Sequence, residues 1–166
     1  MNPYTGAVVT KSATMEKREG NPFPRVGFQD NISINSVGLA NPGYKAIGEM
    51  ALHVTHKPCI LSIHPFDVAE FETMMNFFVT YEQERKPNFI IEVNMSCPNV
   101  EHSKTFYDRF SAFVPLLRKY AKAFNIGIKL PPVTQEYDLL VSLIQKSKVS
   151  FVTCCNTHPN GLLVDA

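Results

Sequence analysis

The stretch NFIIEVNMSCPNV, from Asn88 to Val100, decides how the rest of the chain is interpreted. It starts as a continuous run of β-forming residues and ends in a polar segment that holds Asn94, Cys97 and Asn99. A strand that is apolar on both faces is typical of a parallel sheet covered by helices. Amides and a thiol at the end of such a strand predict chemistry at the carboxyl edge of the sheet.

The same apolar pattern recurs along the chain. It predicts further strands at residues 6–12, 58–64, 126–132 and 150–156. Helical periodicity lies between the strands, at residues 44–54, 66–84, 104–124 and 137–147. This alternation predicts right-handed βαβ units and an α/β fold with a parallel sheet. Residues 13–43 are rich in Gly, Pro, Asn and Arg, and they predict one long loop.

Two architectures satisfy this alternation, a doubly wound open sheet and a barrel. No G-x-G-x-x-G follows a predicted strand, so the dinucleotide-binding open sheet lacks its fingerprint. Polar residues at the strand ends favour a TIM-type (β/α)8 barrel, whose active sites lie on that face. A complete barrel takes about 250 residues, whereas this chain has 166. We therefore predict a parallel barrel that is incomplete.

The composition excludes several classes of protein. Hydrophobic residues make up 45% and charged residues 19%, which is typical of a globular domain. A net charge of +1 predicts no binding to nucleic acid or to an anionic membrane. No apolar run approaches the ~20 residues of a membrane span, and the N-terminus lacks the features of a signal peptide. The four cysteines form no CxxC pair, so we expect no metal site, no disulfide framework and a cytoplasmic location.

Two lysines mark strand ends. Lys11 ends the first predicted strand, where it is either a solvated charge or part of a site. Lys129 stands between apolar residues of GIKLPP, so its ammonium must find a partner, face a polar cavity or reach the rim. Two lysines at one opening would suit an anionic ligand or the electron-rich edge of a flavin.

Cys97 is the candidate catalytic residue. A free cysteine is most often a small buried hydrophobic residue, but this one follows a strand end and precedes a proline. A thiol with a reference pKa of ~8.5 can act as a nucleophile or as a general base. The spacing of the 5 histidines in the sequence identifies none of them as the partner of a nucleophilic cysteine. This favours a general base over a nucleophile as the role of Cys97.

The loops SINSVGLANPG (Ser33–Gly43) and CNTHPNGLLVD (Cys155–Asp165) also suit a small polar ligand. Asparagine amides both donate and accept hydrogen bonds, and exposed backbone N–H groups add donors. The same residues commonly form simple turns. Both interpretations stay open on these stretches alone.

Five ordered blocks of sequence together resemble the soluble, fumarate-using class I dihydroorotate dehydrogenases. The blocks are GAVVTKS…REGNPFPR, SINSVGLANPG, VNMSCPNV, IGIKLPP and FVTCCNTHPNGLLVDA. The resemblance implies a (β/α)8 barrel that binds FMN and oxidises dihydroorotate to orotate in pyrimidine (UMP) biosynthesis. It also implies fumarate as electron acceptor and, for the full-length family, a homodimer.

The resemblance assigns roles to residues of this chain. Cys97 would remove a proton from C5 of dihydroorotate while a hydride passes from C6 to the flavin N5. The implied FMN-binding residues are Lys11, Ser12, Asn94, Lys129 and Cys155. The implied substrate-binding residues are Lys11, Asn35, Ser36, Val37, Gly38, Leu39, Asn94, Asn99, Asn156 and Thr157. Val37 stands where the family usually has Met, and Thr157 where it usually has Ser.

The resemblance extends over residues 1–166 but matches only barrel strands two to six. The strands whose glycine-rich loops hold the FMN phosphate have no counterpart, so we expect a truncated enzyme whose isolated chain is inactive. The alternative is a non-catalytic half-barrel that binds a partner. A remoter option is another flavin-dependent barrel of the dihydropyrimidine dehydrogenase type.

Overall fold

The computed structural model of the protein describes residues 4–54, 56–85, 89–97, 105–132 and 135–158. The five predicted strands form one parallel sheet in the order β1–β4–β5–β6–β7. Their bounds are β1 (Val8–Val9), β4 (Cys59–Ile63), β5 (Ile90–Asn94), β6 (Asn125–Lys129) and β7 (Phe151–Thr153). Within this sheet the strands lie side by side in the order in which they occur in the sequence, without the reversal of strand order that defines a doubly wound sheet. The prediction of an incomplete barrel is confirmed.

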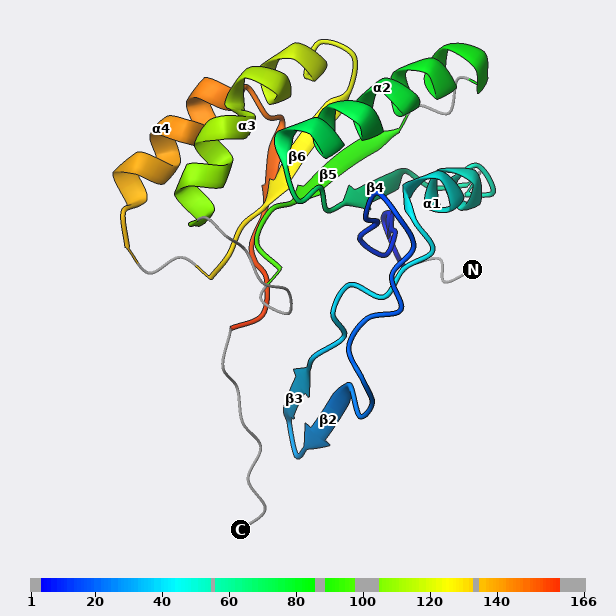
Figure 1. The fold of residues 1–166 in the computed structure, drawn as a ribbon, viewed down its shortest axis with the longest axis vertical. Helices are drawn as coiled ribbons and strands as arrows, with labels where there is room; N and C mark the ends of the chain where they lie inside the picture. The colour runs from blue at the N-terminus through cyan, green and yellow to red at the C-terminus, as the bar shows by residue number, and fades with distance from the viewer. Residues whose placement is uncertain (1–3, 55, 86–88, 98–104, 133–134, 159–166) are drawn as a thin grey trace.

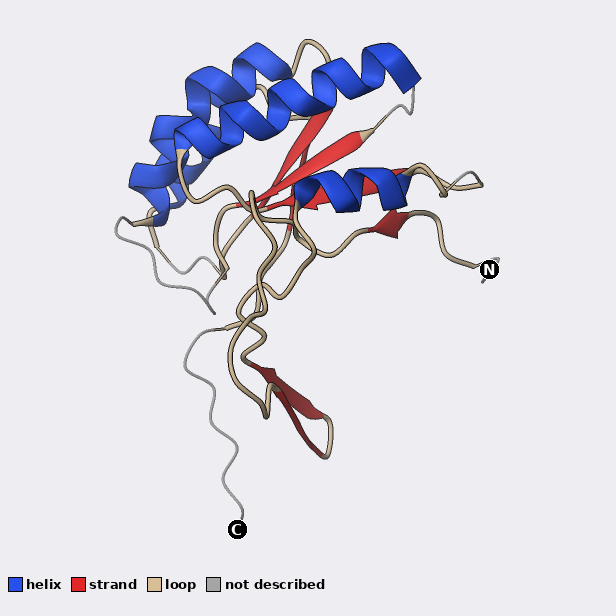
Figure 2. Ribbon diagram, turned by 45° about the vertical axis from the view of Figure 1, so that its right-hand side comes forward, coloured by secondary structure: helices blue, strands red, loops and turns tan. Residues whose placement is uncertain are grey.

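Four helices follow the predicted ranges, namely α1 (Tyr44–Ala51), α2 (Val68–Arg85), α3 (Phe106–Tyr120) and α4 (Tyr137–Ser147). Helices α2, α3 and α4 cover one face of the sheet (Figure 1, Figure 2). Thr105 caps α3, because its hydroxyl accepts a hydrogen bond from the backbone N–H of Asp108 at 3.2 Å. Helices on the outer face and a curled sheet inside are the layers of a (β/α) barrel.

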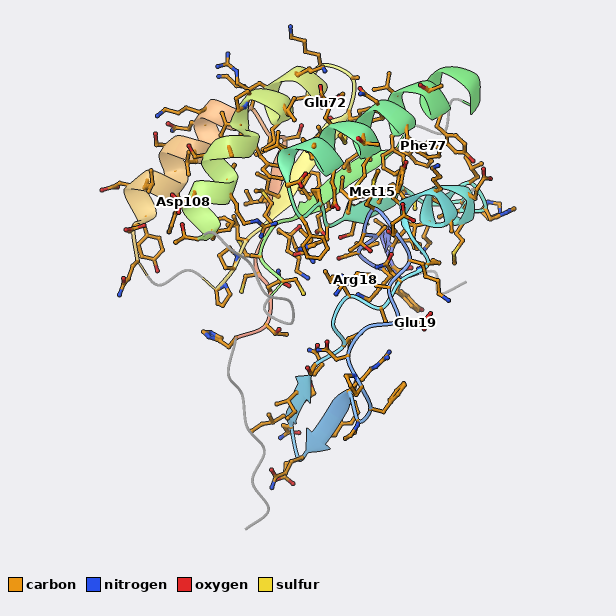
Figure 3. The ribbon with its side chains drawn as sticks, viewed as in Figure 1. Met15, Arg18, Glu19, Glu72, Phe77 and Asp108 are labelled. Atoms are coloured by element: carbon orange, nitrogen blue, oxygen red, sulfur yellow. The ribbon has the colours of Figure 1, made fainter. Side chains whose placement is uncertain are left out.

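The helical stripes predicted from the sequence form the core between the helices and the sheet. The side chains that are fully buried there include Phe71, Met74, Met75, Phe78, Phe110 and Leu117. At the surface, Lys119 of α3 and Glu72 of α2 form an ion pair at 2.7 Å (Glu72 is labelled in Figure 3). An exposed pair of this kind contributes about 0–1 kcal/mol, so the apolar core holds these helices together.

Residues 13–43 are not one long loop, and that prediction was wrong. They contain an antiparallel hairpin of β2 (Val26–Gln29) and β3 (Ile32–Asn35), which projects away from the sheet (Figure 1). Gln29 pairs with Ile32, so the connection has two residues, and the first of them, Asp30, has φ 50°. A positive φ in a two-residue Asp-Asn connection is the geometry of a tight hairpin. Arg18 and Glu19 lie on the segment that leads to it (Figure 3).

Candidate active site

The carboxyl ends of the parallel strands bring distant polar residues together. Asn94 is the last residue of β5 and pairs in register with Lys129, the last residue of β6. Lys129 in turn pairs with Thr153 of β7, three residues before Asn156. Because the strands are parallel, these ends lie at one edge of the sheet, where ligands bind in folds of this kind.

A cavity of about 220 Å³ opens at this edge. It is lined by Lys11, Ser12, Asn35, Val37, Leu39, Asn94, Cys97, Lys129, Cys155, Asn156 and Thr157. Every one of these lining residues belongs to the set predicted from the sequence. Of the other predicted residues, Ser36 and Gly38 do not line the cavity, and Asn99 lies outside the described residues.

Asparagine amides form the polar wall of the cavity. The Asn156 Nδ2 atom donates to Asn94 Oδ1 and to Ser96 Oγ, both at 2.9 Å. Asn94 Nδ2 donates to Ser12 Oγ at 3.0 Å. The Ser96 hydroxyl donates to the Lys129 carbonyl oxygen at 3.2 Å. These bonds tie the ends of β5, β6 and β7 and the segment after β1 to one another.

Cys97 and Lys129 act electrostatically on Lys11. Cys97 is 7% exposed, although it lines the cavity. Partial burial of the ammonium lowers the pKa of Lys11, the Cys97 thiolate opposes that shift, and the Lys129 charge adds to it. Cys97 and Lys129 are therefore close enough for their charges to act on the Lys11 ammonium. Lys129 lines the cavity, which favours the polar cavity among the alternatives that the sequence left open for its ammonium.

Residues behind the cavity fix the strand ends. Arg109 of α3 is buried, and its guanidinium donates to the Met95 carbonyl and, at 3.2 Å, to the Pro65 carbonyl. Burial lowers the pKa of Arg109. The imidazole of His64, which is also fully buried, contacts the Asn94 carbonyl oxygen through Nδ1. Arg109 thus connects α3 to the residues that follow β4 and β5, and His64 connects the ends of these two strands to each other.

The loop that carries Val37 and Leu39 to the cavity is built around Asn41. Asn41 is 7% exposed, and its amide makes four hydrogen bonds within residues 14–43. Gly38 has φ +67°, and a Cβ atom there would lie 2.4 Å from Asn21 Oδ1. Glycine is required at that position because both the backbone conformation and the close neighbour exclude a side chain.

Sequence reasoning missed the supporting residues Asn41 and Arg109. It also missed Glu92 of β5, whose carboxylate accepts hydrogen bonds from the hydroxyls of Ser62 and Thr153 on the neighbouring strands. Glu92 carried a usable signal, since it is a carboxylate inside an otherwise apolar strand. The others are common residue types with ordinary neighbours in the sequence. Their role depends on partners that only the fold supplies.

The donor set at the cavity suits part of a flavin and a small planar ligand. Ammonium, hydroxyl and amide groups can donate to the carbonyl oxygens of a flavin ring edge or to a carboxylate. A volume of about 220 Å³ is below the ~300–1,000 Å³ typical of sites that enclose a whole drug-sized ligand. The cavity therefore does not enclose an entire nucleotide cofactor.

Sequentially ordered parallel strands, with helices outside and a polar cavity at their carboxyl ends, define a protein of the (β/α)-barrel class. A family model described as dihydroorotate dehydrogenase matches residues 2–166. The chain belongs to the dihydroorotate dehydrogenase family. Within the part of the chain that the structure describes, no helix combines the length and the apolar character needed to cross a membrane.

Curated relatives agree with the family. The chain is 34% identical over 170 residues to dihydroorotate dehydrogenase A (fumarate) of Lactococcus lactis subsp. lactis, covering 97% of this chain and 53% of the relative. It is 33% identical over 165 residues to a putative dihydroorotate dehydrogenase A (fumarate) of Streptococcus pyogenes, covering 95% of this chain and 52% of the relative. The chain thus spans about half the length of the curated relatives that it matches.

Solved structures share the fold. A crystal structure of DHODH from Eimeria tenella in complex with ferulenol superimposes with a TM-score of 0.62 at 14% sequence identity. The match covers 92% of this chain and 50% of that one. The five strands and their helices therefore correspond to about half of a larger domain of the same fold.

Proposed function

We propose that the cavity is the site of an FMN-dependent oxidation of dihydroorotate to orotate, in pyrimidine biosynthesis, with fumarate as the electron acceptor. The observation that carries this proposal is the convergence of Cys97, Lys11 and Lys129 with asparagine amides on one cavity. Family membership supports the same reaction. The proposed substrate is a small molecule, and the low net charge of +1 gives no reason to propose a nucleic-acid or membrane partner.

The residues proposed to hold the flavin are Lys11, Ser12, Asn94, Lys129 and Cys155. FMN, when bound, supplies the acceptor for the two electrons that leave the substrate as a hydride from C6. Lysine ammonium groups beside the ring would stabilise negative charge that develops there. The FMN phosphate needs backbone N–H groups from loops other than those that line this cavity.

Asparagine side chains are proposed to bind the substrate, which is a cyclic diamide with a carboxylate. An asparagine amide can pair with a ring carbonyl through Nδ2 or with a ring N–H through Oδ1, and the hydrogen bonds that it makes within the protein decide which of these groups remains for the substrate. Asn94 and Asn156 are hydrogen-bonded to each other, and Asn35 at the end of β3 lines the same cavity, as do Val37 and Leu39 in the segment that follows. The proposed substrate-binding set is completed by Lys11, Ser36, Gly38, Asn99 and Thr157.

Cys97 is the proposed general base. Its thiolate takes the proton from C5, and the C5–H bonding electrons form the C5=C6 double bond as the hydride leaves C6. The low exposure of Cys97, 7%, keeps bulk water from the sulfur. A positioned base of this kind contributes about 10²–10⁴ in rate. We propose further that the complete enzyme is cytoplasmic and homodimeric, as the class I resemblance implies.

The test uses flavin absorbance. Purified protein is loaded with FMN, dihydroorotate is added without oxygen, and bleaching of the flavin band is followed. We expect Cys97→Ala to slow bleaching by about 10²–10⁴ while FMN stays bound. Cys154→Ala is the matched control, because Cys154 is exposed and does not line the cavity. Unchanged bleaching in Cys97→Ala would remove Cys97 from the mechanism.

A non-catalytic half-barrel that binds a partner is the second candidate. The observation in its favour is that the two outer strands expose apolar residues, Val9 of β1 at 54% and Val152 of β7 at 40%. Open strand edges pair readily with other chains. Protein that stays colourless after incubation with FMN, and does not oxidise dihydroorotate, would favour this function over catalysis by the isolated chain.

A further inference from the structure

Glu92 is a buried carboxylate that does not touch the cavity. It lies in the middle of β5 and is 5% exposed. The Ser62 hydroxyl donates to Glu92 Oε1 at 2.8 Å, and the Thr153 hydroxyl donates to Glu92 Oε2 at 2.7 Å. Among the described residues, no ion pair involves Glu92. A buried charge without a cation destabilises a fold, and two hydroxyl donors offset only part of that.

A chain of hydrogen bonds connects Glu92 to the wall of the cavity. Ser62 Oγ lies 2.9 Å from Ser12 Oγ, and Ser12 Oγ lies 3.0 Å from Asn94 Nδ2. Asn94 Oδ1 lies 2.9 Å from Asn156 Nδ2. The chain therefore runs from the carboxylate through two hydroxyls and two amides, across β4, the segment after β1, β5 and the segment after β7.

The carboxylate fixes the direction of every bond in this chain. A carboxylate only accepts, so the single proton of Ser62 points to Glu92. Ser12 must then donate its own proton to Ser62, which leaves Ser12 Oγ able only to accept from Asn94. Turning the Asn94 amide over would bring its oxygen to a hydroxyl that has no proton to give. Glu92 thereby selects the orientation in which Asn94 presents Oδ1 to Asn156.

The same reasoning determines which atoms of the Asn156 amide remain for a ligand. One Nδ2 proton of Asn156 goes to Asn94 Oδ1 and the other goes to Ser96 Oγ. Both donors are used, so Asn156 has only its Oδ1 atom left for a ligand in the cavity. A ring N–H can donate to that oxygen, whereas a ring carbonyl at the same place would meet another acceptor.

We propose that Glu92 is a positioning residue that determines specificity by holding the Asn94 and Asn156 amides so that Asn156 accepts from a ligand N–H. The ligand class is a planar diamide or imide with an N–H at its edge. This inference rests on the proposed function for the choice of orotate as probe. The orientation of the two amides is a property of the protein itself, which can be tested without any ligand.

Glu92→Gln is the test variant, because a glutamine amide no longer fixes the direction of the chain: it can turn its oxygen or its NH2 group to Ser62, and in the second case the whole chain reverses. Orotate and its N-methyl analogues, each with one ring N–H replaced, are titrated calorimetrically into the FMN-loaded protein. The wild type should bind orotate at least about 10-fold more tightly than the analogue methylated at the nitrogen that faces Asn156. Glu92→Gln should weaken orotate binding by about 10-fold and remove most of this preference.

Three controls separate orientation from structural damage. Glu49→Gln makes the same chemical change at an exposed position on α1 and should alter nothing. Thr153→Val removes a donor to Glu92 but leaves the chain through Ser62 intact, so the preference should remain. Ser62→Ala cuts the chain, so the preference should fall as in Glu92→Gln. In urea, Glu92→Gln should unfold no earlier than the wild type, because it removes a buried charge.

The ligand-free arm uses nuclear Overhauser contacts from the Asn156 side-chain amide protons to the Ser96 β-protons. These contacts should be present in the wild type and in Glu49→Gln, and weakened in Glu92→Gln. If the wild type does not bind orotate, the proposed function fails while this arm still tests the role of Glu92. Identical amide contacts in the wild type and Glu92→Gln, or an unchanged preference among the orotates, would overturn the inference.

Discussion

Asn41 holds the loop between β1 and α1, and its replacement gives the sharpest stability prediction. Its Oδ1 atom accepts from the backbone N–H of Thr14 at 3.1 Å and from that of Gly43 at 2.8 Å. Its Nδ2 atom donates to Thr14 Oγ1 at 2.8 Å and to the Leu39 carbonyl at 2.6 Å. Both acceptor positions and both donors of the amide are therefore in use.

The expected magnitude follows from these four bonds. A neutral hydrogen bond contributes about 1 kcal/mol net, and a buried group left without its partner costs about 1–3 kcal/mol. We expect Asn41→Ala to lower the free energy of unfolding by about 4 kcal/mol. Asn41→Asp keeps both acceptor contacts but places an oxygen against the Leu39 carbonyl, and a loss of about 2 kcal/mol is expected.

Urea unfolding followed by circular dichroism measures the global loss. Amide hydrogen exchange at Arg18 and Asn41, whose backbones bond to each other at 2.9 and 3.0 Å, measures local opening of the loop. Asn31→Ala is the control, because Asn31 is exposed in the hairpin turn. If Asn41→Ala costs less than about 1 kcal/mol and leaves both exchange rates unchanged, the amide does not hold this loop.

Two other perturbations test the sheet and the cavity. Gly127→Ala places a Cβ atom 2.2 Å from the Phe151 ring, so we expect the free energy of unfolding in urea to fall by about 1–3 kcal/mol. In the Gly127→Ala/Phe151→Ala double variant, the two effects on this free energy should be coupled by at least about 0.5 kcal/mol. Simple additivity of the two effects would contradict the contact. Lys11 has a pKa lowered from 10.5 mainly by burial, so the folded state binds its proton less tightly than the unfolded state. The charged Lys11 ammonium therefore lowers the stability of the folded state at neutral pH, and this destabilisation disappears as the pH rises toward 10.5. Lys11→Met should therefore stabilise the protein at neutral pH, with a benefit that shrinks at alkaline pH; a benefit independent of pH would exclude the charge as its cause.

The sequence predicted the elements of the sheet well because each strand carries its own signal. Continuous apolar runs such as that of β5 identify a strand covered by helices without knowledge of its neighbours. The hairpin at residues 26–35 also carried a signal, a two-residue Asp-Asn connection between short β-forming runs. It was missed because the Gly, Pro and Asn content of the surrounding segment favoured a loop.

The candidate site could be predicted as a list but not as an arrangement. Cys97, Lys129 and Asn156 each follow or end a predicted strand, and parallel strands bring such ends to one edge. The residues behind them escaped prediction for a physical reason. Arg109 and Asn41 act through backbone carbonyls and N–H groups, which every residue possesses, so nothing in the sequence marks their partners.

The sequence by itself determined the class of fold and the chemical groups at the strand ends, because periodicity and residue type are local properties. The tertiary structure decided which groups meet and in which direction each hydrogen bond points. Ser12 reaches Ser62 across 50 positions of the chain and Asn94 across 82. A buried hydroxyl has one proton to give, so the direction of its hydrogen bond depends on partners that only the packed strands bring within reach. Here the Glu92 carboxylate is the partner that determines the direction, because it accepts the proton of Ser62.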